Sequence, residues 1–437
     1  DLFVVKYNSS GTKQWTKQYG TDRYDEARGV ATDSSGNVYV VGGTKGNLLG
    51  ISNSGRTDAF VIKFNSKGEK QWTKKLGTWQ NDLANGVATD SSGNFYVTGF
   101  TYQHLDGNTS AGNADLFVVK YNSSGTKKWT KQLGTSKHDR ARGVATDSSG
   151  NVYVTGDTYG GLDGNTSAGY NDFFVVKYDS SGTKQWTKQL GTSSTDLANG
   201  VATDSSGNVY VAGGTYGGLD GNTNAGNTDL FVVKYNSSGT KQWTRQLGSS
   251  SRDSANGVAT DSSGNVYVTG MTNGGLDGCK NAGIEDLFVV KYNSSGTKQW
   301  TNQLGSSSRD SADDVATDSS GNIYVTGTTY SELDGNTSAG KADLFVVKYN
   351  SSGTHQWTKQ LGTDRYDEAR GVATDSSGNV YVTGYTEGGL DGNTNAGKAD
   401  LFVVKYNSSG TWQWTKQNGT DRYDEARGVA TDSSGNE

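Results

Sequence analysis

Hydrophobic and polar positions alternate along the chain in short runs that predict β-strands. In the copy that begins at Gly86, GVATD and FYVTGFT flank the turn SSGN, a pattern typical of a β-hairpin. The next run, LFVVKYN, is apolar at successive positions and predicts a strand covered on both faces, and the turn NSSGTK leads from it into a fourth strand, KWTKQLG. No stretch has a 3.6-residue apolar period over a helical length, so the pattern predicts an all-β protein.

This four-strand pattern recurs every 57 residues without insertion or deletion. Repetition of one supersecondary unit favours a single quasi-symmetric domain over residues 1–437, either a propeller of radially packed blades or a linear solenoid. Because solenoid coils are usually shorter, we expect a β-propeller of four-stranded antiparallel blades. Copies of DLFVVKYNSSGTKQWTKQ begin at Asp1, Asp58, Asp115, Asp172, Asp229, Asp286, Asp343 and Asp400, and the last copy is truncated.

Two motifs, GVATDSSGNVYVTG and DLFVVKYNSSGTKQW, resemble the bacterial beta-propeller repeat family over the whole chain. The resemblance implies a propeller, often described as seven-bladed, of the kind found in large secreted or surface proteins of cyanobacteria and other bacteria. It implies little about activity, since propellers include both binding modules and enzymes.

The number of blades depends on how the strands are shared. The sequence holds eight copies of the first, third and fourth strands but seven of the second, which makes 31 strands where eight blades need 32 and seven need 28. Because unpaired strand edges are costly, we expect eight blades, the last one joined from Leu2–Tyr19 and Gly428–Asp432 so that the terminal strands close the ring. Seven blades with a displaced terminal segment is the alternative.

Composition narrows the function. The net charge of -5 is spread along the chain, which excludes the one-sided basic surface that nucleic-acid binding needs, and no segment has the roughly 20 apolar residues of a membrane span. The single Cys279 excludes a disulfide framework. One Cys and one Met in 437 residues favour an extracellular or cell-surface setting, and the start of the sequence within a repeat suggests part of a longer protein.

Differences between copies concentrate in two loops, one before the first strand and one between the second and third strands. Variation on a copied scaffold is expected of a ligand-binding surface, although exposed loops also drift without a function. Aromatic and imidazole side chains in these loops are the candidate residues for stacking on a sugar or a peptide, namely Trp79, Tyr102, His104, His138, Tyr159, Tyr170 and Tyr216.

The second variable loop also suggests calcium. Its LDGN-containing sequence places oxygen-bearing side chains at alternate positions around glycines, as a hard cation requires, but without the bidentate Glu of an EF-hand. In the alternative interpretation these side chains cap their own turns. The candidate ligands are Asp106, Asn108, Ser110, Asp163, Asn165, Asp220, Asn222, Asp334, Asn336, Asp391 and Asn393.

Residues that recur in every copy are expected to be structural. An acid precedes each first strand, at Asp25, Asp82, Asp139, Asp196, Asp253, Asp310, Asp367 and Asp424, and Asp33 with its equivalents opens the DSSGN turn. Once-per-copy tryptophans are expected to fill the space between blades, namely Trp15, Trp72, Trp129, Trp186, Trp243, Trp300, Trp357 and Trp414.

No nucleophile elbow, phosphate-binding loop or histidine cluster is present, and acid pairs such as Asp313-Asp314 are frequent enough to arise by chance. The sequence therefore favours a non-enzymatic extracellular or cell-surface binding or scaffold module. It would present a multivalent loop face to a protein or polysaccharide and need no cofactor. The alternatives are a structural, self-associating subunit of a surface assembly and, third, a hydrolase.

Overall fold

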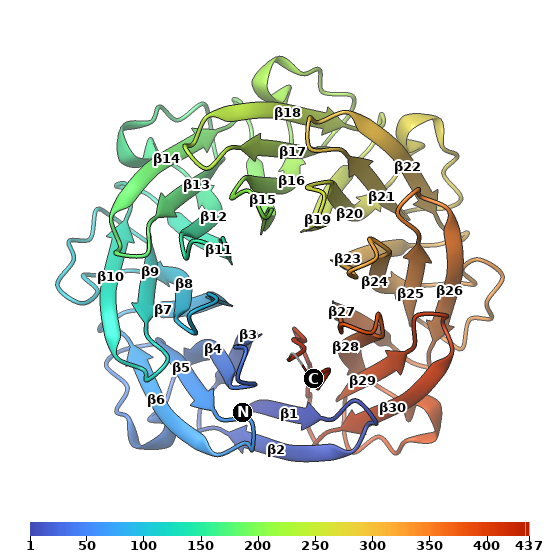
Figure 1. Cartoon of the computed structure of the whole chain (residues 1–437), viewed down its shortest axis with the longest axis horizontal. Coiled ribbons are helices and arrows are strands. Elements are labelled where there is room, and N and C mark those ends of the chain that lie inside the picture. Colours follow the sequence, from blue (N-terminus) through green and yellow to red (C-terminus); the bar gives the residue numbers. More distant parts are fainter. Residues whose placement is uncertain (433, 437) are drawn as a thin grey trace. The chain divides into compact units, whose positions relative to one another are not determined.

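The computed structural model describes residues 1–432 and 434–436. Within them the chain forms thirty β-strands and five short 3-10 helices, so the prediction of an all-β fold is confirmed (Figure 1). The chain divides into two compact units: a first unit of Asp1–Val211 with Lys234–Lys241, and a second unit of Ala212–Val233 with Gln242–Gly435. No helix among the described residues is long and apolar enough to cross a membrane.

The described strands form seven four-stranded antiparallel sheets, here called blades, and one two-stranded sheet. The first strands of the blades are β3 (Asp25–Thr32), β7 (Asp82–Thr89), β11 (Asp139–Thr146), β15 (Asp196–Thr203), β19 (Asp253–Thr260), β23 (Asp310–Thr317) and β27 (Asp367–Thr374). The second strands are β4 (Val38–Thr44), β8 (Phe95–Thr101), β12 (Val152–Thr158), β16 (Val209–Thr215), β20 (Val266–Thr272), β24 (Ile323–Thr329) and β28 (Val380–Thr386).

The third and fourth strands complete each blade. The third strands are β5 (Asp58–Phe64), β9 (Asp115–Tyr121), β13 (Asp172–Tyr178), β17 (Asp229–Tyr235), β21 (Asp286–Tyr292), β25 (Asp343–Tyr349) and β29 (Asp400–Tyr406). The fourth strands are β6 (Lys70–Leu76), β10 (Lys127–Leu133), β14 (Lys184–Leu190), β18 (Lys241–Leu247), β22 (Lys298–Leu304), β26 (His355–Leu361) and β30 (Trp412–Asn418). The two-stranded sheet pairs β1 (Leu2–Tyr7) with β2 (Lys13–Tyr19), and the 3-10 helices are η1 (Leu48–Gly50), η2 (Leu162–Gly164), η3 (Leu219–Gly221), η4 (Leu276–Gly278) and η5 (Leu390–Gly392).

The expectation of eight blades is wrong, and the alternative of seven holds for the described residues. Residues 428–432, which were expected to close an eighth blade with Leu2–Tyr19, form no strand. A first strand takes its ladder hydrogen bonds from the second strand beside it, and the sequence holds only seven second strands. Residues 428–432 have the composition of a first strand, but no second strand among the described residues pairs with them.

The strands are those that the sequence predicts, with one difference at the first strand. In the copy described above the first strand begins at Asp82, before the predicted start at Gly86, because a β-bulge shifts the register between Ala84 and Gly86. The bulge breaks the alternation of side chains, so the apolar pattern becomes readable only after it. The same shift recurs in the other first strands whose pairing is resolved.

The core of each unit lies between neighbouring blades. The third strands are buried along their whole length, as their unbroken apolar sequence predicts. In the first unit Val61 and Tyr39 of one blade pack against Phe95, Phe117 and Val119 of the next, and the second unit repeats this arrangement. Since both faces of a blade are covered in this way, burial of apolar side chains holds each blade to its neighbours.

The recurring tryptophans lie between blades, as predicted. Trp72 stacks on Phe95 of the next blade, with ring centroids 5.4 Å apart and an interplanar angle of 20°, and lies 6.4 Å from Tyr121. A Cβ on Gly125, which has a φ of +80°, would come within 2.4 Å of the Trp72 ring. The NSSGT turn therefore needs glycine both for its backbone conformation and for the close approach of the tryptophan.

Candidate functional site

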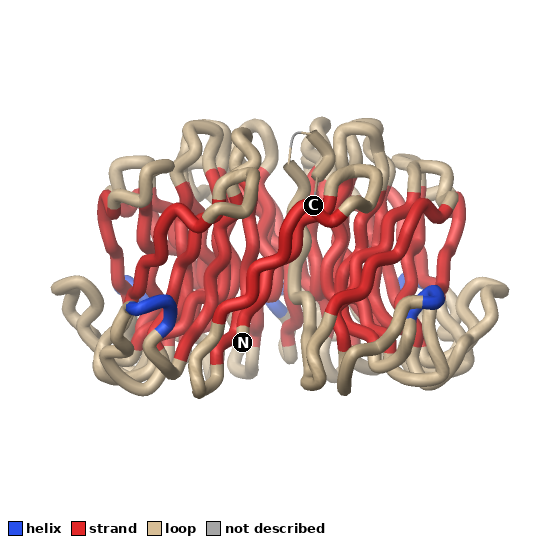
Figure 2. The backbone as a smooth tube through the Cα atoms, turned by 90° about the horizontal axis from the view of Figure 1, so that it is seen from below, coloured by secondary structure: helices blue, strands red, loops and turns tan. Residues whose placement is uncertain are grey.

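Within each blade the short turns and the variable loops lie at opposite ends of the strands (Figure 2). At each junction the residue before a third strand forms a parallel bridge with the residue before the next first strand. The bridges join Thr57 to Asn81, Ala114 to His138, Asn171 to Thr195, Thr228 to Arg252, Glu285 to Arg309, Ala342 to Tyr366 and Ala399 to Tyr423. The two variable loops are therefore held side by side at each of these junctions.

The recurring acid before each first strand organises this pair of loops. Asp82 is fully buried and accepts hydrogen bonds from the backbone N–H of Thr78 at 2.6 Å, from the Thr78 hydroxyl at 2.9 Å and from the Thr101 hydroxyl. Burial raises the pKa of Asp82 to about 6, although these hydrogen bonds favour the carboxylate. The same three contacts recur at Asp139, and Asp367 accepts hydrogen bonds from the backbone N–H and the hydroxyl of Thr363, so the structural role predicted for these acids is confirmed.

Three of the predicted rim residues meet at one place in the first unit. The His138 ring lies edge-on to two tyrosine rings, with its centroid 6.0 Å from that of Tyr102 and 5.9 Å from that of Tyr159. Phe100 lies 5.9 Å from Tyr102, also edge-on, and the Arg140 guanidinium lies 5.5 Å from the centre of the Phe100 ring. We call these five residues the aromatic cluster.

The loop backbone places the aromatic cluster. Tyr102 and Tyr159 each directly follow a second strand, whereas His138 directly precedes the first strand β11. The backbone N–H of Tyr159 donates to the His138 carbonyl at 3.0 Å. Tyr102, His138, Tyr159 and Arg140 are half-buried, and the buried His138 Nδ1 has no hydrogen-bond partner among the described residues. Half-buried rings beside a guanidinium and an unsatisfied imidazole nitrogen can stack on a ligand and hydrogen-bond to it.

The other four rim candidates lie outside the aromatic cluster. The exposed fractions of Trp79, Tyr170 and Tyr216 are 63%, 74% and 48%. The His104 Nδ1 accepts a hydrogen bond of 2.7 Å from the backbone N–H of Ser110, which stabilises its own loop. The sequence therefore predicted three members of the cluster. Phe100 and Arg140 were not predicted, because they lie on strands and the candidates were taken from the variable loops.

The candidate calcium ligands are engaged by their own blade. Asp106, at a positive φ of 53°, accepts hydrogen bonds through Oδ2 from the Thr130 hydroxyl at 2.5 Å and from the Lys127 Nζ at 2.6 Å. The Asn108 amide donates to the Leu105 carbonyl at 2.8 Å. Equivalent contacts hold Asp163 by Lys184, Asp220 by Thr244, Asp334 by His355, and Asn165, Asn222, Asn336 and Asn393 by the preceding leucine carbonyls.

These residues fit a calcium ion poorly. A calcium ion needs six to eight oxygens at one point, whereas the Asp106 carboxylate is already paired with an ammonium group, and the Ser110 hydroxyl donates to the Gly112 carbonyl instead. Among the described residues no group of three or more His, Cys, Asp or Glu side chains is arranged to hold a metal. Calcium binding stays an untested prediction, and the turn-capping interpretation accounts for the contacts observed.

A cluster of acidic side chains surrounds Arg370 in the second unit. The sequence analysis attributed one pair of acids in this cluster, Asp313-Asp314, to chance. Arg370 contacts Glu368 at 2.7 Å, Glu425 at 3.3 Å and Asp313 at 3.9 Å, and its guanidinium lies 5.8 Å from the centre of the Tyr385 ring. A comparison of the copies could have identified this pair, because the other copies have Arg-Gly or Asn-Gly where this copy has Asp313-Asp314. The equivalent pairs are at 28–29, 85–86, 142–143, 199–200, 256–257, 370–371 and 427–428.

The two aspartates of this cluster are unlike each other in their contacts. Asp314 reaches the next blade, where it accepts a hydrogen bond of 3.0 Å from the backbone N–H of Val372. Burial raises the pKa of Asp314 to about 6 and that of Asp313 to about 7, in the latter case against the attraction of Arg370. Asp314 thus ties two blades together, while Asp313 supplies a carboxyl that titrates near neutral pH.

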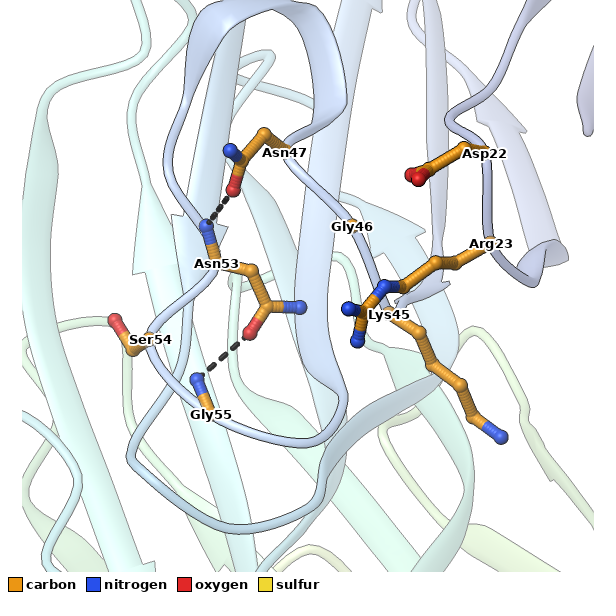
Figure 3. Close-up of a pocket in the computed structure, with 8 residues that line it drawn as sticks. All are labelled: Asp22, Arg23, Lys45, Gly46, Asn47, Asn53, Ser54 and Gly55. Carbon is orange, nitrogen blue, oxygen red and sulfur yellow. Dashed lines mark hydrogen bonds between the residues drawn. The ribbon is translucent and has the colours of Figure 1, made fainter.

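A polar pocket of about 370 Å³ lies between two loops of the first unit (Figure 3). The Asn47 side-chain oxygen accepts the backbone N–H of Asn53 at 2.8 Å, and the Asn53 side-chain oxygen accepts that of Gly55 at 2.7 Å. These two side-chain amides hold the loop in shape. The cationic groups that line the pocket are those of Arg23 and Lys45, which are both exposed. The lining residues are Asp22, Arg23, Lys45, Gly46, Asn47, Asn53, Ser54 and Gly55.

Similar proteins identify the repeat but name no ligand. An uncharacterized WD repeat-containing protein of Acanthamoeba polyphaga mimivirus is 24% identical over 457 residues, which cover 88% of this chain and 31% of the viral protein. The regulatory protein FlaEY of Caulobacter vibrioides is 26% identical over 396 residues, covering 79% of this chain and 41% of that protein. The chain thus spans less than half the length of either relative.

A gluconolactonase from Xanthomonas campestris matches 70% of this chain and 83% of its own chain at 11% identity, with a TM-score of 0.34. The family model of the beta-propeller repeat matches residues 14–50, 128–163, 185–220, 242–277, 299–334 and 356–391. The first of these matches begins in β2 and the other five begin in fourth strands, and each runs through a first and a second strand into the loop that follows. Since the repeat recurs from residue 14 to residue 391, the chain belongs to the beta-propeller repeat family.

Proposed function

We propose that the chain is a non-catalytic binding module that works outside the cell or at its surface and recognises a protein or a polysaccharide through its variable loops. The observation that carries the proposal is the aromatic cluster, in which Tyr102, His138 and Tyr159 come together from two neighbouring junctions. Flat rings that are half-buried offer a large contact area at a low cost in side-chain entropy.

The repeated scaffold supports the same function. Paired variable loops recur at each of the bridged junctions, so a repetitive polymer could engage several junctions at once. Weak contacts repeated on one scaffold gain affinity by avidity, without any single deep pocket. The chain has only one cysteine and one methionine, so it offers few side chains to oxidation. This composition supports the extracellular setting, where oxidising conditions are common.

The test is a screen of the full chain on glycan and peptide arrays, followed by calorimetry with the best ligand. We expect the double variant Tyr102→Ala with Tyr159→Ala to weaken binding at least tenfold, which corresponds to roughly 1.4 kcal/mol. The control, Trp412→Ala, removes an exposed ring from the fourth strand β30, outside the variable loops, and should leave affinity unchanged. Equal affinities of the double variant and this control would disprove the role of the cluster.

A further inference from the structure

The polar pocket of the first unit lies where the loop before β3 meets the loop after β4, within the blade formed by β3 to β6 (Figure 3). The backbone N–H of Lys45 donates to the Tyr24 carbonyl at 2.9 Å, which joins the two loops at their ends. A Cβ on Gly46 would come within 2.2 Å of the Thr21 hydroxyl, so glycine allows the loops to approach closely here. The pocket is therefore built by contacts between the loops of one blade.

An ion pair holds the wall that the second of these loops forms. The Lys75 Nζ lies 3.0 Å from the carboxylate of Asp58, which is fully buried. The same ammonium group donates to the Ser54 hydroxyl at 2.6 Å and to the Ser52 carbonyl. The other seven copies have Gln at the position of Lys75, so this arrangement belongs to the first blade alone. A wall that is already ordered lowers the entropic cost of binding a ligand.

The charged side chains of the lining are two cations, Arg23 and Lys45, and one acid, Asp22. Neither cation forms an ion pair with an acid among the described residues. Figure 3 shows the Arg23 guanidinium extending from its loop towards Asn53. The exposed Lys45 Nζ lies 5.6 Å from the centre of the Tyr24 ring. The pocket therefore has an excess of positive charge that an anionic ligand can use.

The remaining side chains of the lining are uncharged and polar. Asn53 is engaged at its backbone N–H, its side-chain oxygen and its side-chain nitrogen, so it shapes the wall. The Asn47 side-chain oxygen accepts the Asn53 N–H, which leaves the Asn47 amide nitrogen to donate to a ligand. The Ser54 hydroxyl accepts from Lys75 and keeps its own proton to donate. These two donors come from the wall that faces Arg23.

The size and the polarity of the pocket indicate the class of ligand. Its volume of about 370 Å³ lies at the lower end of the range for pockets that hold small organic molecules. Such pockets are usually lined by hydrophobic and aromatic side chains, and this lining has none. A guanidinium group pairs with a carboxylate through two parallel hydrogen bonds. The lining therefore suits a small molecule that carries a carboxylate and several hydroxyl groups.

We propose that this pocket binds a uronic acid, a sugar whose ring carries one carboxylate. Arg23 holds the carboxylate through two parallel N–H···O bonds, and the charge of Lys45 attracts it to the pocket. The Asn47 amide and the Ser54 hydroxyl donate to the ring hydroxyls. Asp22 disfavours a second negative charge on the ligand. The pocket shares no residue with the aromatic cluster, so each site can bind without the other.

The test is calorimetric titration of the full chain with sodium D-galacturonate and sodium D-glucuronate. We expect saturable binding of at least one of them, and at least tenfold weaker binding of D-galactose and D-glucose, which lack the carboxylate, and of acetate, which lacks the ring. Tighter binding of trigalacturonate than of the monomer would identify a polymer as the source, and equal binding the free sugar. Failure of both uronates to bind, equal binding of a neutral sugar or of acetate, or preference for glucose 6-phosphate would overturn the proposal.

Variants taken from other copies test the two cations without disturbing the fold. Arg23→Ser introduces the serine that stands at 194, 251 and 308, and Lys45→Glu introduces the glutamate that stands at 387. The backbone N–H of Glu387 donates to the Tyr366 carbonyl at 2.8 Å, as that of Lys45 does to Tyr24, so this loop accepts either side chain. Each variant should weaken uronate binding at least tenfold and leave the melting temperature unchanged.

The matched control is Arg365→Ser. Arg365 is the equivalent of Arg23 in the copy where Glu387 replaces Lys45, so its loss should leave uronate binding unchanged. Binding that survives both pocket variants, or that the control weakens as much as they do, would overturn the pocket. The outcome is distinguishable from that of the loop function proposed above, which is tested by variants of Tyr102 and Tyr159.

Discussion

Aspartates that recur at different positions of the repeat differ in pKa, because burial and hydrogen bonding shift the pKa of a carboxyl group in opposite directions. Burial opposes ionisation of Asp33, but donors from Asn37, Tyr39 and the backbone of Ser35 outweigh it and lower its pKa. For Asp82 burial dominates and raises the pKa to about 6. A sequence can show that such acids recur but cannot show this balance, since it depends on how many donors the fold brings to each carboxylate.

Asp313 gives a prediction at this scale. Its pKa is raised to about 7, chiefly by burial, so the folded state holds a proton that the unfolded state releases near pH 4. The stability this group contributes is therefore present in acid and is lost as pH rises through about 7. We expect the melting temperature of the native chain to fall between pH 6 and pH 8. Because Asp313 is still 26% exposed, the loss should be only about 1 kcal/mol.

The variant Asp313→Asn, which restores the Asn of position 256, should remove this part of the pH dependence. Thermal melts at pH 6 and pH 8 measure it. The exposed Asp364→Asn serves as the control and should behave as the native chain does. If both variants and the native chain keep the same pH dependence, Asp313 does not titrate in this range.

At the scale of elements, the sequence predicted what depends on local pattern. Strand type and the burial of third strands follow from runs such as LFVVKYN, and the hairpin turns follow from their Asp, Asn and Gly residues. The β-bulge at Ala84, the Phe100 and Arg140 members of the aromatic cluster and the Arg370 cluster were not predicted. Each of them depends on pairing or on contacts between different blades, which no local period records.

The tryptophan between blades gives a prediction for these elements. Trp72→Ala would leave a gap beside Phe95 and Tyr121, and since the ring is half-buried we expect a loss of about 2–3 kcal/mol in the free energy of unfolding. The control is Trp412→Ala, because Trp412 is 49% exposed and should cost less than about 0.5 kcal/mol. Urea denaturation followed by circular dichroism measures both. Comparable losses would mean that the ring contact contributes little.

At the scale of the whole molecule, the near identity of the copies makes their strands interchangeable. A second strand such as β8 pairs with β9 through residues that β12 and β13 share almost completely. Register within one pair is fixed by which side chains face the core, but nothing in that pattern distinguishes a copy in the same chain from a copy in another. During folding the choice between them depends on local concentration alone.

Refolding should therefore depend on protein concentration. After dilution from urea, we expect the fraction of native-size protein to fall as the final concentration rises from about 0.1 to about 10 µM, because exposed strands then meet copies on other chains. Size-exclusion chromatography measures this fraction, and never-unfolded protein at the same concentrations is the control. Association of that control would instead indicate a contact between folded chains. A yield that stays constant over this range would show that each chain pairs its own strands faster than it meets another chain, despite their shared sequence.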